Sequence, residues 1–206
     1  MPPSNSKIVA VLTPARERPE GLERHIKSIL STTDKADVLV YNDDGPNPIG
    51  PTAAVNKLWR GNSEYKYYMF GSTDHFMIDN GWCDRLIETV DKWPGKIGVA
   101  WNNDSLGAPH RDPGAIARFP FVSAEFLNVL GWFFLPGTFR YYPDDALTHL
   151  AFSTRAGYLV DVISKHEHNP VPSGAAATQH DFSVYYNWLR DTAPSDIARL
   201  LEAMNV

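Results

Sequence analysis

The sequence contains little cysteine and no long apolar run. Cys83 is the single cysteine among 206 residues, so a disulfide within the chain is impossible and a reducing compartment is expected. Residues 129–136 form the longest apolar stretch, which is far too short to cross a bilayer, and residues 1–6 hold no run of signal-peptide type. These absences predict a soluble, cytoplasmic protein without a membrane span.

Sequence signatures of several other enzyme classes are missing as well. The chain has no Gly-Lys-Ser/Thr phosphate loop, no Gly-x-Ser-x-Gly elbow and no Cys-x-x-Cys pair. Cys83 stands without an evident His and Asn partner set, which argues against a thiol nucleophile. The formal net charge of -5 gives no basic footprint for non-specific nucleic-acid binding, so an acceptor carried on DNA or RNA is disfavoured although not excluded.

The residues that are present follow the pattern of a folded α/β chain. Hydrophobic residues make up 43% and charged residues 21%, which are ordinary shares for a globular protein. Short apolar runs alternate with segments of helical periodicity, which predicts a mostly parallel sheet. Residues 102–118 are rich in Gly, Pro and Asp and are expected to form a lid-like loop. Strands are expected at 7–12, 36–41, 66–70, 97–101 and 158–164, and helices at 22–30, 53–59, 83–92, 123–130, 144–156 and 182–204.

Polar clusters follow the first three predicted strands, at the edge where parallel sheets bind ligands. Arg16 and Arg18 come after the first strand, and their guanidinium groups suit a diphosphate. Asp43–Gly45 ends the second strand and suits the N–H and O–H donors of a nucleoside. Thr73–His75 ends the third and offers ligands for Mg²⁺ or Mn²⁺. Taken alone, Asp43–Gly45 is more typical of a simple turn and the two arginines of solvated side chains, and the one Asp of Thr73–His75 does not decide between a turn and a metal site.

Two further features lie in the second half of the chain. His166 and His168 are two residues apart, so on an extended segment both project to one side and suit metal or phosphate contact. Unrelated surface histidines, or a zinc site that lacks visible partners, are the alternatives. Asp144 and Asp145 follow an aromatic pair at 141–142. Helix capping explains such acids, and a general base beside a sugar-stacking platform explains them equally.

In this order, the segments resemble the GT-A glycosyltransferases, especially their small inverting, family-two-like members. The likeness runs from about Lys7 to Asp181. The matching segments are Ile8–Arg16 for the opening strand and nucleotide loop, Val38–Gly45 for the acidic second strand, Tyr68–His75 for the Asp-x-Asp region, Asp144-Asp145 for the acidic pair and His166 with His168 for the late histidine.

The resemblance implies a GT-A-like three-layer sandwich in a single domain over residues 1–206. A Rossmann-like nucleotide-sugar half would cover about 7–101, an acceptor half 102–181 and a helical tail 182–206. A UDP-sugar donor, Mn²⁺ or Mg²⁺, and transfer to an acceptor hydroxyl with inversion are expected. The implied residues are Thr13, Pro14, Arg16, Arg18, Asp43, Asp44 and Thr73 for the donor nucleotide, Asp74, His75, His166 and His168 for the metal, and Asp145, with Asp144 as second choice, for the general base.

One position departs from the family pattern. Thr73 stands where the first acid of the Asp-x-Asp motif is usual, which is similar to phage-encoded members and leaves fewer carboxylates for a metal. Two rival functions stay open: a sugar-phosphate nucleotidyltransferase, although residues 13–19 hold no glycine, and a non-catalytic nucleotide-sugar-binding protein. The acceptor is left open among a polysaccharide, a modified nucleobase in DNA, a protein and a small molecule.

Overall fold

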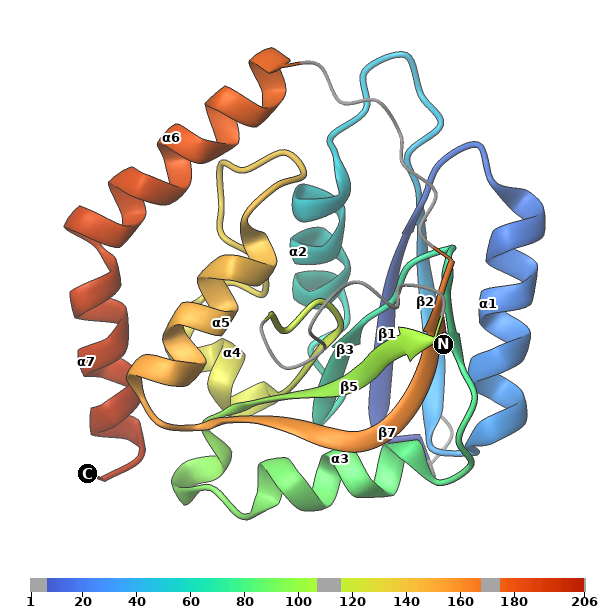
Figure 1. The fold of residues 1–206 in the computed structure, drawn as a ribbon, viewed down its shortest axis with the longest axis horizontal. Helices are drawn as coiled ribbons and strands as arrows, with labels where there is room; N and C mark the ends of the chain where they lie inside the picture. Colours follow the sequence, from blue (N-terminus) through green and yellow to red (C-terminus); the bar gives the residue numbers. More distant parts are fainter. Residues whose placement is uncertain (1–6, 107–115, 168–174, 206) are drawn as a thin grey trace.

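The computed structural model describes residues 7–106, 116–167 and 175–205. Proline in the first turn begins α1, α2, α5 and α7, where its missing N–H leaves no helical hydrogen bond unmade. The elements, shown in Figure 1, are β1 (Val9–Ala15), α1 (Pro19–Thr32), β2 (Ala36–Asn42), α2 (Pro51–Gly61), β3 (Tyr67–Phe70), β4 (His75–Met77), α3 (Trp82–Asp91), the short 3-10 helix η1 (Pro94–Lys96), β5 (Val99–Leu106), β6 (Pro120–Ser123), α4 (Ala124–Leu130), α5 (Pro143–Ser153), β7 (Gly157–His166), α6 (Ala175–Asp191) and α7 (Ala193–Ala203).

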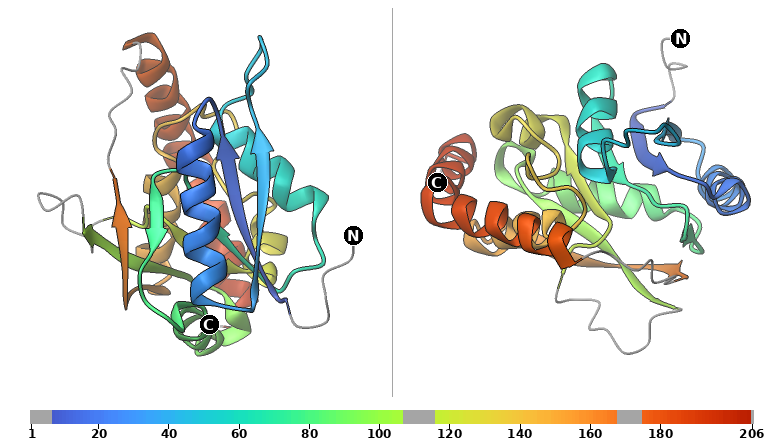
Figure 2. Two further views of the ribbon diagram at one scale, coloured as in Figure 1. Left: turned by 90° about the vertical axis from the view of Figure 1, so that its right-hand side faces the viewer. Right: turned by 90° about the horizontal axis from the view of Figure 1, so that it is seen from above.

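The strands form one sheet in the order β2-β1-β3-β6-β5-β7-β4. β1 pairs in parallel with β2 and β3, and β5 pairs in parallel with β7. β6 runs antiparallel to both β3 and β5, and β4 runs antiparallel to β7. Five of the seven strands that the described residues form therefore share one direction, which confirms the predicted mostly parallel sheet. Figure 2 shows the strong twist between its two ends.

Alternating side chains on the strands define a core on each face of the sheet. Val9 and Val11 of β1 pack with α1 and α3 on one face. Ala10 and Leu12 pack with α2 and helices α4–α7 on the other. Helices thus cover both faces (Figures 1 and 2), and the predicted α/β three-layer sandwich is confirmed. No helix within the described ranges is long and apolar enough to span a bilayer.

The sequence-based prediction was wrong in three places. β5 continues to Leu106, into the segment expected to be a loop, because its polar residues have partners: Asn102 donates to the Ser164 hydroxyl and Asp104 accepts from Arg118. Strands β4 and β6 were not predicted, since each has only three or four residues. Helix α6 begins at 175 rather than 182.

Candidate functional site

A cavity of about 690 Å³ lies where the parallel strands end. Asp43 reaches it after β2, Asp74 after β3, and Asp144 from the first turn of α5. Arg118, two residues before the antiparallel strand β6, lines the same cavity because β6 begins at the edge where its neighbours finish. Side chains about 100 residues apart in the chain therefore meet at one edge of the sheet, as ligand sites in such sheets do.

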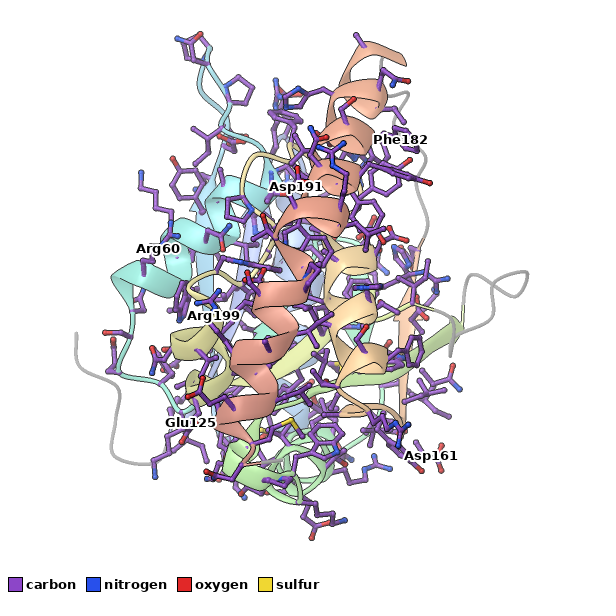
Figure 3. The ribbon with its side chains drawn as sticks, turned by 90° about the vertical axis from the view of Figure 1, so that its left-hand side faces the viewer. Arg60, Glu125, Asp161, Phe182, Asp191 and Arg199 are labelled. Carbon is purple, nitrogen blue, oxygen red and sulfur yellow. The ribbon has the colours of Figure 1, made fainter. Side chains whose placement is uncertain are left out.

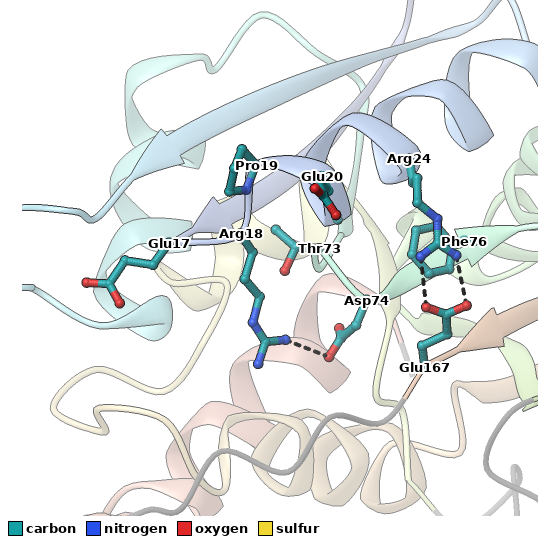
Figure 4. Close-up of a pocket in the computed structure, with 10 residues that line it drawn as sticks. Glu17, Arg18, Pro19, Glu20, Arg24, Thr73, Asp74, Phe76 and Glu167 are labelled. Atoms are coloured by element: carbon teal, nitrogen blue, oxygen red, sulfur yellow. Dashed lines mark hydrogen bonds and ion pairs between the residues drawn. The ribbon is translucent and has the colours of Figure 1, made fainter.

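The loop after β1 forms one wall of this cavity. Pro14, Arg16 and Arg18 line it, as do Thr73 and Asp74 after β3. The Arg18 guanidinium lies 3.7 Å from the Asp74 carboxylate, and both are partly exposed. Figure 4 shows the two side chains pointing toward each other. At this spacing, the guanidinium can bind a phosphate group while the carboxylate binds a metal ion held by the same phosphate.

A second cavity of about 620 Å³ opens on the other side of Arg18 and Asp74. Its outer wall is the paired Arg24 and Glu167, joined by two hydrogen bonds of 3.0 and 2.8 Å, with the Arg24 guanidinium 4.3 Å from the ring centre of Phe76 (Figure 4). Hydrogen bonds from Arg24 and Lys165 lower the pKa of Glu167 to about 2. Glu167 therefore stays ionised and closes the rim with a fixed charge pair.

Asp43 organises the wall formed by the loop before α2. Its two carboxylate oxygens accept hydrogen bonds from the backbone N–H groups of Ile49 and Gly50, both at 2.9 Å. Gly50 has φ +82°, and a Cβ there would lie 2.7 Å from the ring of Phe139, so only glycine fits. Asp44 does not line the cavity; it accepts from the Glu17 N–H at 2.8 Å and so ties the loop after β1 to the end of β2.

Two of the predicted site residues lie beneath the cavity instead of lining it. Thr13 is fully buried, with its hydroxyl 3.1 Å from Nε2 of His25. His75 is also fully buried, stacked on Phe119 with ring centres 3.6 Å apart, and its Nε2 lies 3.3 Å from the Asn102 amide. Burial lowers the pKa of His75 well below its ordinary value, so the ring is neutral at pH 7.

His166 links the cavity to a buried ion pair. Its Nε2 lies 3.8 Å from Asp74, and its Nδ1 lies 3.5 Å from Asp104. Arg118 donates to both carboxylate oxygens of Asp104 at 2.9 Å. Burial alone would raise the pKa of Asp104, but the hydrogen bonds from His166 and Arg118 lower it, so Asp104 is a carboxylate at neutral pH. A carboxylate at Nδ1 favours the tautomer in which Nε2 carries the lone pair.

The donor set at Asp74 fits a divalent cation that is completed by a ligand. Among the described residues, no group of three or more His, Cys, Asp or Glu side chains is arranged to hold a metal. Asp74 and His166 are 3.8 Å apart, and two atoms bound to one ion at about 2.1 Å lie roughly 3 to 4.2 Å from each other. His168, the other predicted ligand, lies outside the described residues. Diphosphate oxygens and water would have to supply the rest.

Asp144 and Asp145 occupy different positions despite being neighbours. Asp144 lines the cavity, whereas Asp145 is not among the described residues that do so. The Asp144 carboxylate accepts a hydrogen bond from the Asp145 N–H at 3.2 Å. Burial, with the adjacent Asp145 charge, raises the pKa of Asp144 to about 6. Burial also raises the pKa of Asp145. A carboxylate with such a pKa can take up a proton near neutral pH.

The sequence analysis did not identify three residues that shape the site. Asp104 and Arg118 lie within residues 102–118, the segment that was expected to be a loop. Asp181, fully buried in α6, accepts the backbone N–H groups of residues 139–141 at 2.7 to 2.8 Å. Nothing in the local sequence marks that long-range contact.

No known family model and no curated protein matches this sequence. Solved structures do resemble the fold. TarS of S. aureus aligns with a TM-score of 0.60 at 12% identity, over 96% of this chain but only 43% of TarS. A variant of Drosophila β1,4-galactosyltransferase 7, solved with manganese, UDP-Gal and xylobiose, gives 0.61 at 14% identity over 84% of this chain and 78% of that one.

A third structure, glucosyl-3-phosphoglycerate synthase from Mycobacterium tuberculosis with Mn²⁺, UDP and glucosyl-3-phosphoglycerate, gives a TM-score of 0.56 at 14% identity, over 97% of this chain and 81% of that one. All three are glycosyltransferases of the GT-A type. The chain therefore has the GT-A fold, as the sequence resemblance predicted. At these identities the likeness establishes the architecture, and the chemistry has to be argued from the site itself.

Proposed function

We propose that this protein is a glycosyltransferase that moves a sugar from a UDP-sugar to an acceptor hydroxyl with the help of a divalent cation. The observation that carries the proposal is the single cavity at the sheet edge where Asp43, Asp74 and Asp144 meet. The solved structures with this fold that contain UDP and Mn²⁺ support it. The donor nucleotide would lie between the loop after β1 and the start of α2, where Pro14, Arg16 and Asp43 line the cavity.

Each wall of the cavity would perform one part of donor binding. Asp43 keeps its loop in place through two backbone hydrogen bonds, and each of its oxygens still has a lone pair for an N–H or O–H of the nucleoside. Arg18 would contact the diphosphate beside Asp74. Asp74 and His166, with the predicted His168, would hold the cation. That cation would neutralise the charge that grows on the UDP leaving group.

We assign the general base to Asp144 in preference to Asp145, because Asp144 faces the cavity and its pKa is raised to about 6. The acceptor oxygen forms a bond to the anomeric carbon while the bond from that carbon to the diphosphate oxygen breaks. The acceptor proton passes to the Asp144 carboxylate, and UDP departs with the electron pair of the broken bond. A single displacement of this kind inverts the anomeric centre.

Binding of UDP with Mn²⁺ tests the donor half of the proposal. Calorimetric titration should show Mn²⁺-dependent UDP binding that Asp74→Ala abolishes and that Asp104→Asn weakens by about 10- to 100-fold, the usual effect of removing a partner behind a metal-bound histidine. Asp161→Ala, at an exposed position on β7, is the matched control and should bind as the unaltered chain does. Equal binding by Asp74→Ala and the unaltered chain would contradict the metal site.

Product analysis separates the rival functions. The transferase should release UDP and free sugar slowly from a UDP-sugar in water, and faster when an acceptor is present. A nucleotidyltransferase would instead form a nucleotide sugar from a nucleoside triphosphate and a sugar phosphate. A binding protein would retain UDP affinity without releasing UDP from any of a panel of UDP-sugars.

A further inference from the structure

Aromatic side chains lie beside the cavity, on the segment just before α5 and on α6. Phe139 lines the cavity and is 38% exposed. Tyr142, just before α5, stacks on Tyr185 with ring centres 5.3 Å apart and rings 13° from parallel. Phe182, 38% exposed, meets Tyr186, 53% exposed, at 4.4 Å, and Figure 3 shows Phe182 projecting from the upper part of α6. We call these five residues the aromatic surface: Phe139, Tyr142, Phe182, Tyr185 and Tyr186.

The backbone that carries the aromatic surface is fixed in advance. Asp181 accepts hydrogen bonds from the N–H groups of Phe139, Arg140 and Tyr141, at 2.7, 2.8 and 2.8 Å. Tyr142 is held in the left-handed region, at φ 66° and ψ 1°, directly before the helix that bears Asp144. α6 and the loop at residues 139–142 are therefore tied together, and a ligand meets rings that are already in place.

The polar groups that α6 contributes to the aromatic surface are almost all uncharged, and the loop at residues 139–142 adds one exposed cation, Arg140. Between 175 and 188, the first fourteen residues of α6, Asp181 is the only Asp, Glu, Lys or Arg, and it is buried. Gln179, Ser183 and Asn187 are exposed and follow one another at intervals of four, so they lie along the same side of the helix as Tyr186. Amide and hydroxyl groups of this kind both donate and accept hydrogen bonds.

This composition suits a saccharide better than a nucleic acid. The C–H face of a sugar ring packs against the negative face of an aromatic ring, and sugar hydroxyls pair with amides and hydroxyls. A nucleic acid also stacks on aromatic rings, but it requires cations along its phosphates. Arg190 at the end of α6 is the only Lys or Arg of that helix, and Arg140 is the only one of the loop at residues 139–142, which is too few to follow a run of phosphates.

We propose that the aromatic surface binds the acceptor and that the acceptor is an oligosaccharide or polysaccharide. Its reacting hydroxyl would lie at Asp144, and the following sugar units would rest on Phe182 and Tyr186. This inference rests on the proposed function, because it names the acceptor class of the same site. It assigns to α6 a binding role in addition to its packing on α7.

Saccharide binding to the full chain tests the proposal. The probes are xylo-, cello-, malto- and chito-oligosaccharides of two to six units, added to the protein with UDP and Mn²⁺ and observed by saturation-transfer NMR. At least one series should bind, and Phe182→Ala and Tyr186→Ala should each weaken it by about tenfold, the usual effect of truncating an aromatic anchor. Tyr158→Ala removes an aromatic side chain that is 60% exposed on β7 and should change nothing.

The readouts distinguish failure of this inference from failure of the proposed function. UDP and Mn²⁺ binding, and UDP release from a UDP-sugar in water, should be unchanged in both α6 variants. Two outcomes would overturn the saccharide surface and leave the transferase assignment intact, provided that UDP still binds. In the first, no saccharide binds; in the second, the Phe182→Ala/Tyr186→Ala double variant binds saccharide as well as the unaltered chain does. If the unaltered chain binds single-stranded DNA and both variants fail to bind it, the saccharide surface is overturned in favour of a nucleic-acid acceptor. If the unaltered chain does not bind UDP, the proposed function itself is overturned, and the acceptor inference with it.

Discussion

Asp43 and Asp144 line one cavity and are held in different ways. Both carboxylate oxygens of Asp43 accept backbone N–H groups at 2.9 Å, so each oxygen has a donor in the fold. The carboxylate of Asp144 accepts the N–H of the next residue at 3.2 Å, and burial, with the adjacent Asp145 charge, raises its pKa to about 6. The first carboxylate stabilises a loop, whereas burial disfavours the ionised form of the second.

Under the proposed function, this difference would separate a binding acid from a reacting one. A carboxylate that holds a loop in position is surrounded by donors, as Asp43 is. A carboxylate that must accept a proton works best with a pKa near the working pH and with an oxygen facing the substrate. Each of these two acids also differs from its own neighbour in the sequence. Neither Asp44 nor Asp145 is among the described residues that line the cavity. In each adjacent pair, the fold selects one member for the site.

The largest expected effect is on the transfer rate. Asp144→Asn removes the proton acceptor and should lower the rate of sugar transfer by about 10²- to 10⁴-fold while leaving UDP and Mn²⁺ affinity unchanged. UDP release in the presence of acceptor measures the rate, and titration measures the affinity. Asp145→Asn is the matched control and should keep most of the rate. An equal loss in both variants would mean that the contrast between the two acids is not catalytic.

A smaller effect is expected on stability from a change at Asp43. In Asp43→Asn the amide NH₂ faces a backbone N–H, so Ile49 or Gly50 loses its acceptor. The free energy of unfolding should fall by about 1–3 kcal/mol, as measured by urea denaturation, and UDP should bind more weakly. Asp44→Asn keeps an oxygen for its one exposed contact and should stay within about 0.5 kcal/mol of the unaltered chain.

A gain in stability at high pH is expected on removing Asp144. Its pKa is about 6 in the folded chain and about 3.9 when unfolded, so its contribution to stability is present below about pH 4 and is lost as pH rises through 6. Asp144→Asn should therefore melt above the unaltered chain at pH 8 and together with it at pH 4, with about 2–4 °C for each kcal/mol. A difference that is constant from pH 4 to pH 8 would show that the titration of Asp144 is not its cause.

Much of the fold could be predicted because its strands are strong local signals. The apolar runs that became β1, β2 and β3 are each followed by a polar turn, and a parallel sheet brings such turns together at one edge. β6 was missed because it is four residues long and begins with proline. β5 was cut short because Asn102 and Asp104 favour turns when they are seen alone, and their partners Ser164 and Arg118 are distant in the sequence.

The site was predicted less evenly than the fold. Pro14, Arg16, Arg18, Asp43, Thr73, Asp74 and Asp144 do line the cavity. Their roles stay predictions, as do those of Asp145, His166 and His168. Thr13 and His75 each come directly after a predicted strand or its turn, which suggested that they are exposed. In the structure both side chains are fully buried beneath the cavity.

The sequence by itself determined the order of strands and helices, the polar turns at the strand ends and the neutral character of α6. These follow from local chemistry: the period of apolar residues, the preferences of turn residues and the charge of each segment. The tertiary structure alone decided which acid of each pair lines the cavity, that Asp104 and Arg118 lie behind His166, and that the rings of α6 pack against Tyr142. Those outcomes depend on packing between segments far apart in the chain, where burial and hydrogen-bond partners, rather than residue type, set the charge and direction of a side chain.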